Sequence, residues 1–571
     1  MTLPVLNLPL LSSKRPKPYI KAKQFNLWLK GLPIGNVKKS SQIVLQQLKI
    51  LNQSRYPYSE RSQLLDALRP TFRQLLLSLK QPLHQAQLPL SHDNLLIAEL
   101  IQKLLIEMAH GYKLITSDLM EKKSAKENDQ LLLRESIYLS IQYLARSIVE
   151  SYLVYSSPQY DAWRELHQLY RYAEYESIQN EPIDDPYPDH PLPIQYTIDL
   201  AYKRIVLLSL SAPYHLMQNE AEDIFYLVSA WTSVCNISEL DKKHISDQYG
   251  VDFATDMSPR YIPENLEWEP VDGRIIDINR VKERLNNHIT KVLRYNFDSD
   301  DFLEHDETPQ SLRERQQRDM LLRLTDAWHS NLTRGNDRKD RGARLRMALS
   351  LNACHFYSSN KASFTPEMDE LRLLSKENKQ ATVFANSYRD ALHKDRLHEK
   401  SAYPISPWQQ HNISHTGLAL SCADSCQNMN VKVGEVVSYL FESKTGQHWK
   451  IGIIRWLQIN EKNNVEMGIM NLAHSAVPIA VKAVDGIGKG TDYFRSLLIP
   501  KQVSIKQLRS VIVPALLYDI GSILSVNMKT KLFYIKLTKL IISSGNIAMF
   551  EFDTLENAPV DLSADLSGDN I

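Results

Sequence analysis

The chain has 571 residues, of which 67 are basic and 66 acidic, for a formal net charge of +1. This length is too great for one ordinary core, so we expect two to four domains. The even charge balance excludes a general electrostatic attraction to nucleic acid, and four cysteines exclude a disulfide framework and indicate ordinary thiols in a reducing compartment. No uninterrupted apolar run reaches about 18 residues, which excludes a membrane span. We therefore expect a cytoplasmic protein that binds no nucleic acid.

Residues 1–35 form the first predicted segment, an N-terminal extension. Its beginning is apolar but contains Pro4 and Pro9, and the first positive charges, Lys14 and Arg15, come after the apolar run. A secretory signal carries its positive charges before that run. The pattern therefore does not predict a secretory signal.

Apolar residues spaced three and four apart predict a helical domain over residues 36–180. Its helices are expected at Ser59–Lys80, Asp93–Leu114, Asn128–Tyr155 and Gln159–Ile178. Pro70 is expected to kink or divide the first of them, because proline lacks the amide that a helix needs. Long helices joined by short polar turns indicate stacked antiparallel pairs. Such a stack can be an interaction surface for a protein partner or an inert scaffold, and the pattern favours neither.

The segment Glu181–Pro193 contains five prolines and four acidic residues, which predicts a loop. Because three of these acids, Asp184, Asp185 and Asp189, are crowded between prolines, we interpret the loop as an acidic linker rather than a calcium site. A second helical block is expected over residues 194–333. Its helices are expected at Ile194–Leu216, Glu220–Cys235, Asp277–Leu293 and Pro309–Leu332, with a short strand possible within Tyr249–Tyr261.

The sequence pattern changes from helical to strand-like over residues 334–555. Short β-rich segments divided by polar turns predict an antiparallel barrel with added strands there. Trp408 and Trp449 lie on these strands, and one or both should fill the barrel. The tail, residues 556–571, is acidic and rich in small residues, which predicts disorder. The predicted fold class is α+β multidomain, with an all-α N-terminal region of stacked antiparallel helices and a C-terminal antiparallel β-barrel. The strands are expected at Trp408–Asn412, Leu418–Ser421, Val433–Glu442, Trp449–Gln458, Val465–Leu472, Val477–Val484, Ser510–Leu517, Ile523–Asn527, Leu532–Leu540 and Ala548–Phe552.

One turn inside the predicted barrel carries an Asn-x-Ser-x-x-Gly pattern, formed by Asn412, Ser414 and Gly417. Asparagine and serine can bond nearby backbone and a ligand, and glycine permits a positive φ and a close backbone approach. The simplest interpretation is a well-made β-turn. The pattern also resembles the second motif of PilZ domains, and the strand at 433–437 and the hairpin over 451–469 follow it as in that family.

The resemblance spans residues 334–485, and the chain as a whole resembles large PilZ proteins with a long helical N-terminal region. It implies a receptor for cyclic di-GMP, the bacterial second messenger that PilZ domains bind. The first PilZ motif, Arg-x-x-x-Arg, lies on the segment entering the barrel, and Arg334 and Arg338 have that spacing. Guanidiniums can grip a phosphate bidentately or stack on a guanine. Arg341 and Arg344 follow, so the implied ligand-binding set is these four arginines with the three turn residues.

The two motifs are far apart in the sequence, because the gap from Arg338 to Asn412 is much longer than a compact PilZ domain needs. The insertion before Tyr403 would have to loop out for the motifs to meet. If the motifs do not meet, the arginines are a solvated linker that makes only surface ion pairs.

No catalytic residue, metal site or cofactor is predicted. The closest histidine pairs, His393 with His398 and His411 with His415, lack an accompanying glutamate motif on a helix. We predict a cytoplasmic bacterial signalling regulator, not an enzyme, that senses cyclic di-GMP and acts on an unidentified protein partner through its helical region. The alternative is a degenerate PilZ-like adaptor or scaffold that binds protein partners but no nucleotide.

Overall fold

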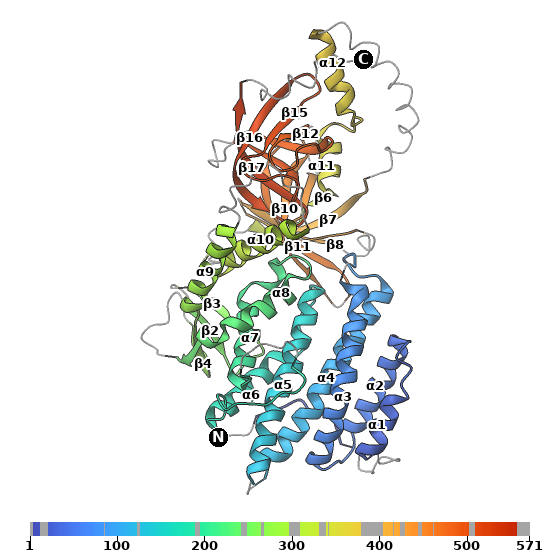
Figure 1. The fold of residues 1–571 in the computed structure, drawn as a ribbon, viewed down its shortest axis with the longest axis vertical. Helices are drawn as coiled ribbons and strands as arrows, with labels where there is room; N and C mark the ends of the chain where they lie inside the picture. The colour runs from blue at the N-terminus through green and yellow to red at the C-terminus, as the bar shows by residue number, and fades with distance from the viewer. Residues whose placement is uncertain are drawn as a thin grey trace. The chain divides into compact units, whose positions relative to one another are not determined.

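The computed structural model contains two compact units, a helical unit built mainly from residues 4–295 and a β unit built mainly from residues 339–556 (Figure 1). Within the described residues, no helix is both long and apolar enough to cross a bilayer. The described residues are 4–11, 21–84, 86–122, 126–188, 195–240, 248–263, 268–295, 309–329, 339–340, 342–377, 403–414, 416–422, 429–442, 448–460, 462–501 and 509–556.

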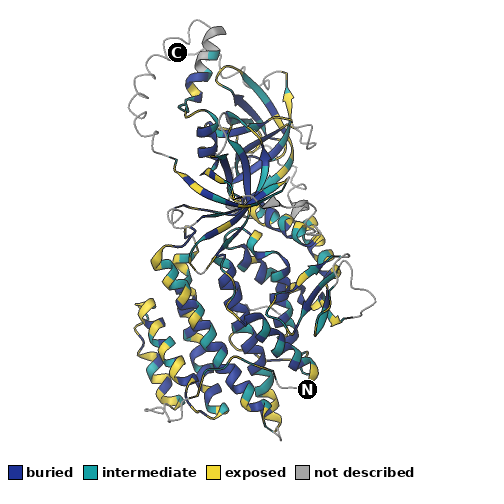
Figure 2. Cartoon of the chain, turned by 180° about the vertical axis from the view of Figure 1, so that it is seen from behind, coloured by how far each residue is buried: buried dark blue, intermediate teal, exposed yellow. Residues whose placement is uncertain are grey.

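The helical unit is a stack of amphipathic helices around one apolar core. Figure 2 shows its helices buried on their inner faces and exposed on their outer faces. The Asn36, Ser91 and Thr197 side chains each accept a hydrogen bond from the first turn of a helix, which fixes where α2, α4 and α7 begin. The helices are α1 Ala22–Lys30, α2 Val37–Asn52, α3 Tyr58–Lys80, α4 His92–Met120, α5 Glu127–Leu153, α6 Ala162–Tyr175, α7 Ile198–Leu210 and α8 Glu220–Leu227, with short 3₁₀ turns at Gln81–Leu83, Pro213–His215 and Val228–Val234.

Pro70 does not divide α3, which runs unbroken from Tyr58 to Lys80. The α3 helix packs against α2 and α4. Leu68 and Phe72, on either side of the proline, are both buried. Packing on both sides therefore holds a helix that the proline alone would weaken.

A four-stranded antiparallel sheet follows the helices, where the sequence indicated one short strand. Its order is β1-β4-β2-β3. The strands are too short for a strong periodic signal, and one of them is held by Gly250, where a Cβ would lie 2.7 Å from the Trp268 ring. The strands are β1 Asn236–Glu239, β2 Gln248–Asp252, β3 Arg260–Ile262 and β4 Gly273–Asp277, and two helices follow, α9 Asn279–Tyr295 and α10 Pro309–His329.

The β unit begins with a closed antiparallel barrel. Its order is β7-β6-β9-β10-β11-β8, and pairing of β7 with β8 closes it. Trp408 fills its interior, being 2% exposed, with its indole donating to the Ser406 hydroxyl at 2.7 Å. Trp449 is half-buried and packs on Tyr357 instead. The strands of this first barrel are β6 Arg344–Leu349, β7 Ile405–Ile413, β8 Gly417–Cys422, β9 Val436–Phe441, β10 Lys450–Ile459 and β11 Val465–Ala473, with the short β5 Lys339–Asp340 added beside β7.

A second closed barrel follows, with strand order β12-β13-β14-β17-β16-β15. The sequence predicted these strands as additions to the first barrel, but they close on one another. The two barrels share apolar contacts that include Ile453, Ile499 and Met549. The strands are β12 Val477–Asp485, β13 Phe494–Ile499, β14 Ser510–Pro514, β15 Ile523–Asn527, β16 Leu532–Ser543 and β17 Ile547–Leu555.

The insertion between β6 and β7 begins with two helices, α11 Leu351–Ser358 and α12 Pro366–Glu377. The α11 helix contacts β6 and β9 of the first barrel and β12 and β13 of the second. Glu370 of α12 pairs with Lys482 at 2.9 Å, on the second barrel. The insertion therefore leaves the first barrel and docks on the second. Residues 378–402, and the predicted disordered tail beyond residue 556, lie outside the described residues.

The cysteines are not all ordinary thiols. Cys235 and Cys354 are free and buried, and burial raises the pKa of the Cys235 thiol to about 12. Cys422, on β8, is disulfide-bonded, so the prediction of a thiol there is wrong. The fourth cysteine, Cys426, lies outside the described residues.

Candidate functional site

The turn between β7 and β8 is closed by the serine of the predicted motif. The Ser414 amide donates to the Gly417 carbonyl at 2.8 Å. In return, the Gly417 amide donates to the Ser414 hydroxyl oxygen at 3.2 Å. Ser414 thus satisfies backbone groups that a tight reversal would leave unpaired.

Gly417 is required by a close backbone approach. A Cβ at this position would lie 2.3 Å from the Ile469 carbonyl oxygen on β11. Gly417 is the first residue of β8 and pairs with Met470 on the neighbouring strand β11. Its φ does not lie in the left-handed region. The glycine is therefore needed for the close backbone approach and not for a positive φ.

Asn412 lies on the outer face of the barrel because of a β-bulge. Gln410 points inward and is 2% exposed, and in a regular strand Asn412, two residues on, would point inward too. The register shifts between these two residues, so that Gln410 pairs with buried Leu420 while Asn412 pairs with Ala419. The bulge therefore turns the half-buried Asn412 side chain outward.

A row of small residues extends from Asn412 across the outer face. Asn412 pairs with Ala419, and Ala419 pairs with Gly468 on β11. Directly opposed residues in antiparallel strands point to the same side, so these three share one face. Two of the three side chains are a methyl group and a hydrogen atom, and both of these residues are buried, so the row is narrow enough for a larger side chain to pack over it.

The Trp456 indole covers Gly468 at the end of this row. A Cβ at Gly468 would lie 1.8 Å from the Trp456 Nε1, so the indole occupies the space that any larger residue would fill. Trp456 is half-buried and keeps part of its ring accessible. The sequence interpretation missed Trp456 as a site residue. The available signal was Gly468 itself, since a glycine inside a strand indicates close approach by another group.

The described residues support a meeting of the arginine segment with the turn. Arg334, Arg338 and Arg341 lie outside the described residues. However, β5 pairs with β7, placing Lys339 opposite Ile413 and Asp340 opposite Asn412. This strand lies between Arg338 and Arg341 in the sequence. The segment that enters the barrel therefore runs directly beside Asn412.

Arg344 is the one predicted arginine that the structure describes. It is exposed on β6 and pairs with Gln409 on β7. The long insertion does not separate it from the motif turn, because the insertion leaves from the far end of β6 and returns at the far end of β7. Arg344 and Asn412 thus lie on adjacent strands of one sheet.

Three family models match consecutive parts of this chain. The N-terminal domain of the cyclic-di-GMP receptor FimW matches residues 23–243, and the middle PilZ domain of that receptor matches residues 249–396 and 368–478. The middle part of the chain thus matches a PilZ domain. The third model, the FimW C-terminal β-barrel domain, matches residues 479–555. The resemblance predicted from the Asn412 motif is confirmed, and the second barrel has a family model of its own.

The chain is also similar to one curated protein along almost its whole length. The cyclic-di-GMP receptor FimW of Pseudomonas aeruginosa (strain PAO1) is 22% identical over 580 aligned positions, which cover 94% of this chain and 92% of the receptor. No solved structure matches the chain significantly. The predicted α+β multidomain fold, with a helical N-terminal region and a PilZ barrel, is thus confirmed.

Proposed function

We propose that this PilZ-domain protein is a receptor for cyclic di-GMP, which binds on the outer face of the first barrel. The observation that carries the proposal is the pairing of β5 directly beside Asn412, on the face where the half-buried Trp456 indole covers Gly468. The half-buried Trp456 ring suits a purine base, which gains from stacking on an aromatic face. The likeness to a receptor of that name supports the same ligand.

Each residue has a distinct role in this proposal. Asn412 offers its amide to a base edge or phosphate, while Ser414 and Gly417 set the turn that holds it in place. Arg344, with Arg334, Arg338 and Arg341 of the entering segment, supplies guanidiniums. Cyclic di-GMP carries two phosphate charges and two guanines, and guanidiniums can grip the former and stack on the latter. The ligand would be the only small molecule needed, with no cofactor or metal.

Signalling rather than catalysis is the proposed role. We propose that the protein acts in the cytoplasm, and that its helical unit binds a protein partner. Ligand binding then changes partner affinity only if the two ligation states differ in their contacts with the partner. A protein with the same fold that binds partners but no nucleotide is the alternative outcome.

Calorimetric titration of the full chain with cyclic di-GMP tests the proposal. We expect binding to the unaltered protein and at least a tenfold loss of affinity in Asn412→Ala. We expect a similar loss in Gly468→Ala, because the added methyl group displaces the Trp456 indole from its place. The matched control is Asn546→Ala, which removes an asparagine from the turn before β17 of the second barrel and should leave affinity unchanged.

Two results would count against the receptor. If the unaltered chain releases no heat with high-micromolar cyclic di-GMP, the adaptor alternative is correct. If the unaltered chain binds but Asn412→Ala and Gly468→Ala bind equally well, the ligand lies elsewhere on the molecule.

A further inference from the structure

Residues 4–11 lie against the helical unit and are held there through the backbone of one residue. The Asn7 amide donates to the Glu165 Oε1 at 2.7 Å, and the Asn7 carbonyl accepts from the Lys113 Nζ at 2.8 Å. Lys113 belongs to α4 and Glu165 to α6, so the segment bonds to two helices at once. Asn7 itself is exposed. These contacts use groups that every residue except proline carries, an amide hydrogen and a carbonyl oxygen.

The two helix residues form a buried ion pair. The Lys113 Nζ lies 2.6 Å from the Glu165 Oε1, and with the segment in place the two residues are 0% and 5% exposed. A buried charged pair is costly unless its remaining donors and acceptors are also bonded. A lysine has three donor hydrogens and a carboxylate has several acceptor sites, so the pair can bond further groups beyond its own contact. One peptide residue supplies the matching acceptor and donor.

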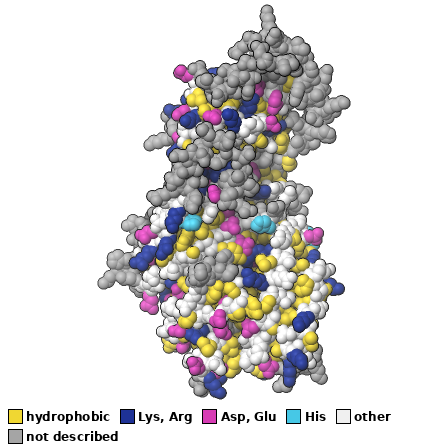
Figure 3. Space-filling model, viewed as in Figure 1, with side chains coloured by type: hydrophobic (Ala, Val, Ile, Leu, Met, Phe, Trp, Pro, Cys, Tyr) yellow, Lys and Arg dark blue, Asp and Glu magenta, His cyan; other side chains and the backbone are white. Residues whose placement is uncertain are grey.

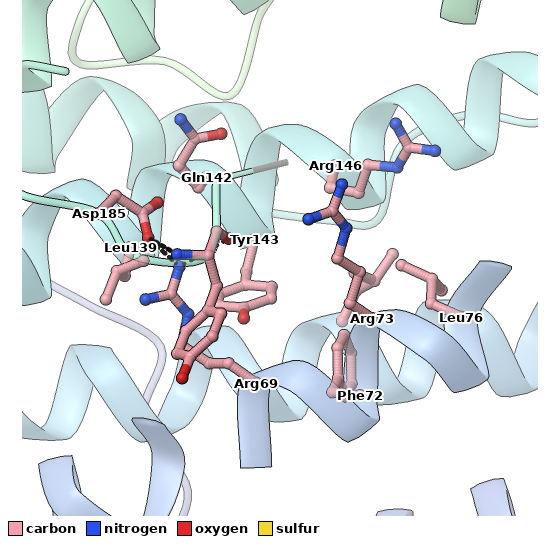
Figure 4. A pocket seen from close by; sticks show the side chains of 11 residues that line it. Arg69, Phe72, Arg73, Leu76, Leu139, Gln142, Tyr143, Arg146 and Asp185 are labelled. Atoms are coloured by element: carbon pink, nitrogen blue, oxygen red, sulfur yellow. Dashed lines mark hydrogen bonds and ion pairs between the residues drawn. The ribbon is translucent and has the colours of Figure 1, made fainter. Parts of the chain in front are cut away.

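A second buried ion pair of the helical unit also holds a backbone, but its origin is different (Figure 4). The Arg69 Nη2 lies 2.5 Å from Asp185 and donates to the Tyr187 carbonyl at 3.1 Å. Asp185 accepts from the Tyr187 amide at 3.0 Å. Asp185 is buried, so its interpretation as part of an acidic linker is wrong. This loop brings its own carboxylate, whereas Lys113 and Glu165 both belong to helices and form their pair without a charge from the segment.

The side chains of the segment alternate between two faces. Pro4, Leu6 and Leu8 are half-buried, whereas Val5 and Asn7 are exposed. Such alternation is typical of an extended chain, whose successive side chains point to opposite sides. Leu6 packs against the apolar core of the helical unit. The helical unit therefore binds an extended peptide through one backbone unit and through inward apolar side chains.

We propose that this surface, formed by Lys113, Glu165 and the core under Leu6, binds an extended apolar peptide of another protein, which displaces residues 4–11. The inference rests on the proposed binding of a protein partner by the helical unit and names its place and kind. Because the bonded groups are backbone and the packed side chains are apolar, a different sequence with leucines at the inward positions makes the same contacts.

The identity of the occupant follows from what the segment leaves unused. Val5 and Leu10 are 75% and 92% exposed, so most of their apolar surface is not buried. A peptide that buries more apolar surface can bind more tightly than the segment. A second copy of this chain carries the identical segment, so it gains nothing over the tethered one, which has the higher effective concentration. A different protein is therefore the expected partner.

Fluorescence anisotropy of a labelled peptide with the sequence Thr2–Arg15 tests the site on the full chain. The variant Leu6→Asp should free the surface, because a carboxylate cannot replace Leu6 against the apolar core. We expect this variant to bind the peptide at least tenfold more tightly than the unaltered chain, whose own segment competes. The matched control, Leu10→Asp, changes an exposed leucine and should behave like the unaltered chain.

Changes in the peptide separate backbone recognition from sequence recognition without altering the protein. Methylating the amide nitrogen of Asn7 removes the donor to Glu165 and should weaken binding to the Leu6→Asp chain at least tenfold. The same methylation at Leu10 is the control and should change affinity less than twofold. A peptide with Val5→Thr, Asn7→Ala and Leu10→Ser together should also bind within twofold, because all three residues are exposed.

Several results would overturn the site: no binding to the Leu6→Asp chain at high-micromolar peptide, equal affinity of that variant and the unaltered chain, or equal binding of the two methylated peptides. Loss of binding by the triply substituted peptide would mean that the surface accepts only this chain's own sequence, which overturns the foreign partner. In sedimentation, a dimer of the unaltered chain that excess peptide dissociates would identify a second copy as the occupant and overturn it too. Cyclic di-GMP binding is measured separately, so these failures leave the proposed receptor unaffected.

Discussion

The two barrels contain the same serine-closed hairpin turn but differ in what surrounds it. In the first barrel, Ser414 and Gly417 exchange two hydrogen bonds, of 2.8 and 3.2 Å. In the second, the Ser544 amide donates to the Ile547 carbonyl at 2.8 Å, and the Ile547 amide donates to the Ser544 hydroxyl at 3.0 Å. The turn geometry is therefore not by itself evidence of a ligand site.

The neighbouring residues make the difference. The positions that correspond to Asn412 and Gly417 are Ile542 and Ile547 in the second barrel, and both pack in the apolar cluster between the barrels. On the outer face, small residues follow Asn412, whereas Lys536 faces Asp553 and Lys539 faces Glu551 in the second barrel. On the face that Figure 3 shows, charges of both signs are interspersed. The two barrels thus share one turn but carry different side chains around it.

The largest expected effect comes from placing alanine at the equivalent position of each turn, Gly417 in the first barrel and Ile547 in the second. Gly417→Ala should lower the free energy of unfolding by about 3 kcal/mol, because its methyl group meets the Ile469 carbonyl. Ile547→Ala should cost about as much for the opposite reason, since it leaves a cavity. Urea unfolding measures both. Gly342→Ala, with no atom closer than 3.5 Å to the new carbon, is the control and should change little.

A pH dependence should come from Glu435, just before β9 of the first barrel. Burial raises the pKa of its carboxyl to about 7, against a smaller lowering by Lys432. Because the folded state holds this proton more tightly than the unfolded state, stability should fall as pH rises from about 4.5 to 7, by about 3 kcal/mol. Glu435→Gln should lose that part of the pH dependence in urea unfolding. An unchanged pH profile would contradict the assignment.

The two turn serines should differ in their contribution to stability. Ser544 is buried and its hydroxyl also donates to the Gly434 carbonyl at 2.7 Å, so Ser544→Ala should cost about 2 kcal/mol. Ser414 is half-buried, and Ser414→Ala should cost about 1 kcal/mol. Thermal unfolding compares them. Equal costs would mean that the contact with Gly434 contributes nothing.

The last prediction separates two arginines on one strand by their effect on ligand affinity. Arg344→Gln should weaken cyclic di-GMP binding about tenfold, or ~1.4 kcal/mol. Arg346 is also exposed on β6 but lies two residues farther from Asn412, at about 7 Å along the strand. Arg346→Gln should therefore change affinity less than twofold in calorimetry. Equal losses would indicate general electrostatic attraction rather than a placed contact.

Local pattern was sufficient for much of the chain. The periodic apolar residues of α3, α4 and α5 predicted those helices to within a few residues at most of their ends. The Asn412 motif predicted a hairpin and its family, because a tight turn requires particular side chains at fixed spacing. The function of the turn residues as backbone partners follows from the same local chemistry.

Long-range pairing needed the tertiary structure. The β-strands of residues 405–555 look alike in sequence, and nothing local states that β12–β17 close separately from β6–β11. The Trp456 indole packs on Gly468, one strand away, and the buried Arg69 guanidinium pairs with Asp185, in a distant loop. The sequence alone determined which segments form helices, turns and strands, because those preferences act over a few residues. Only the fold decided which side chains meet, because contacts between distant residues depend on the packing of the whole chain.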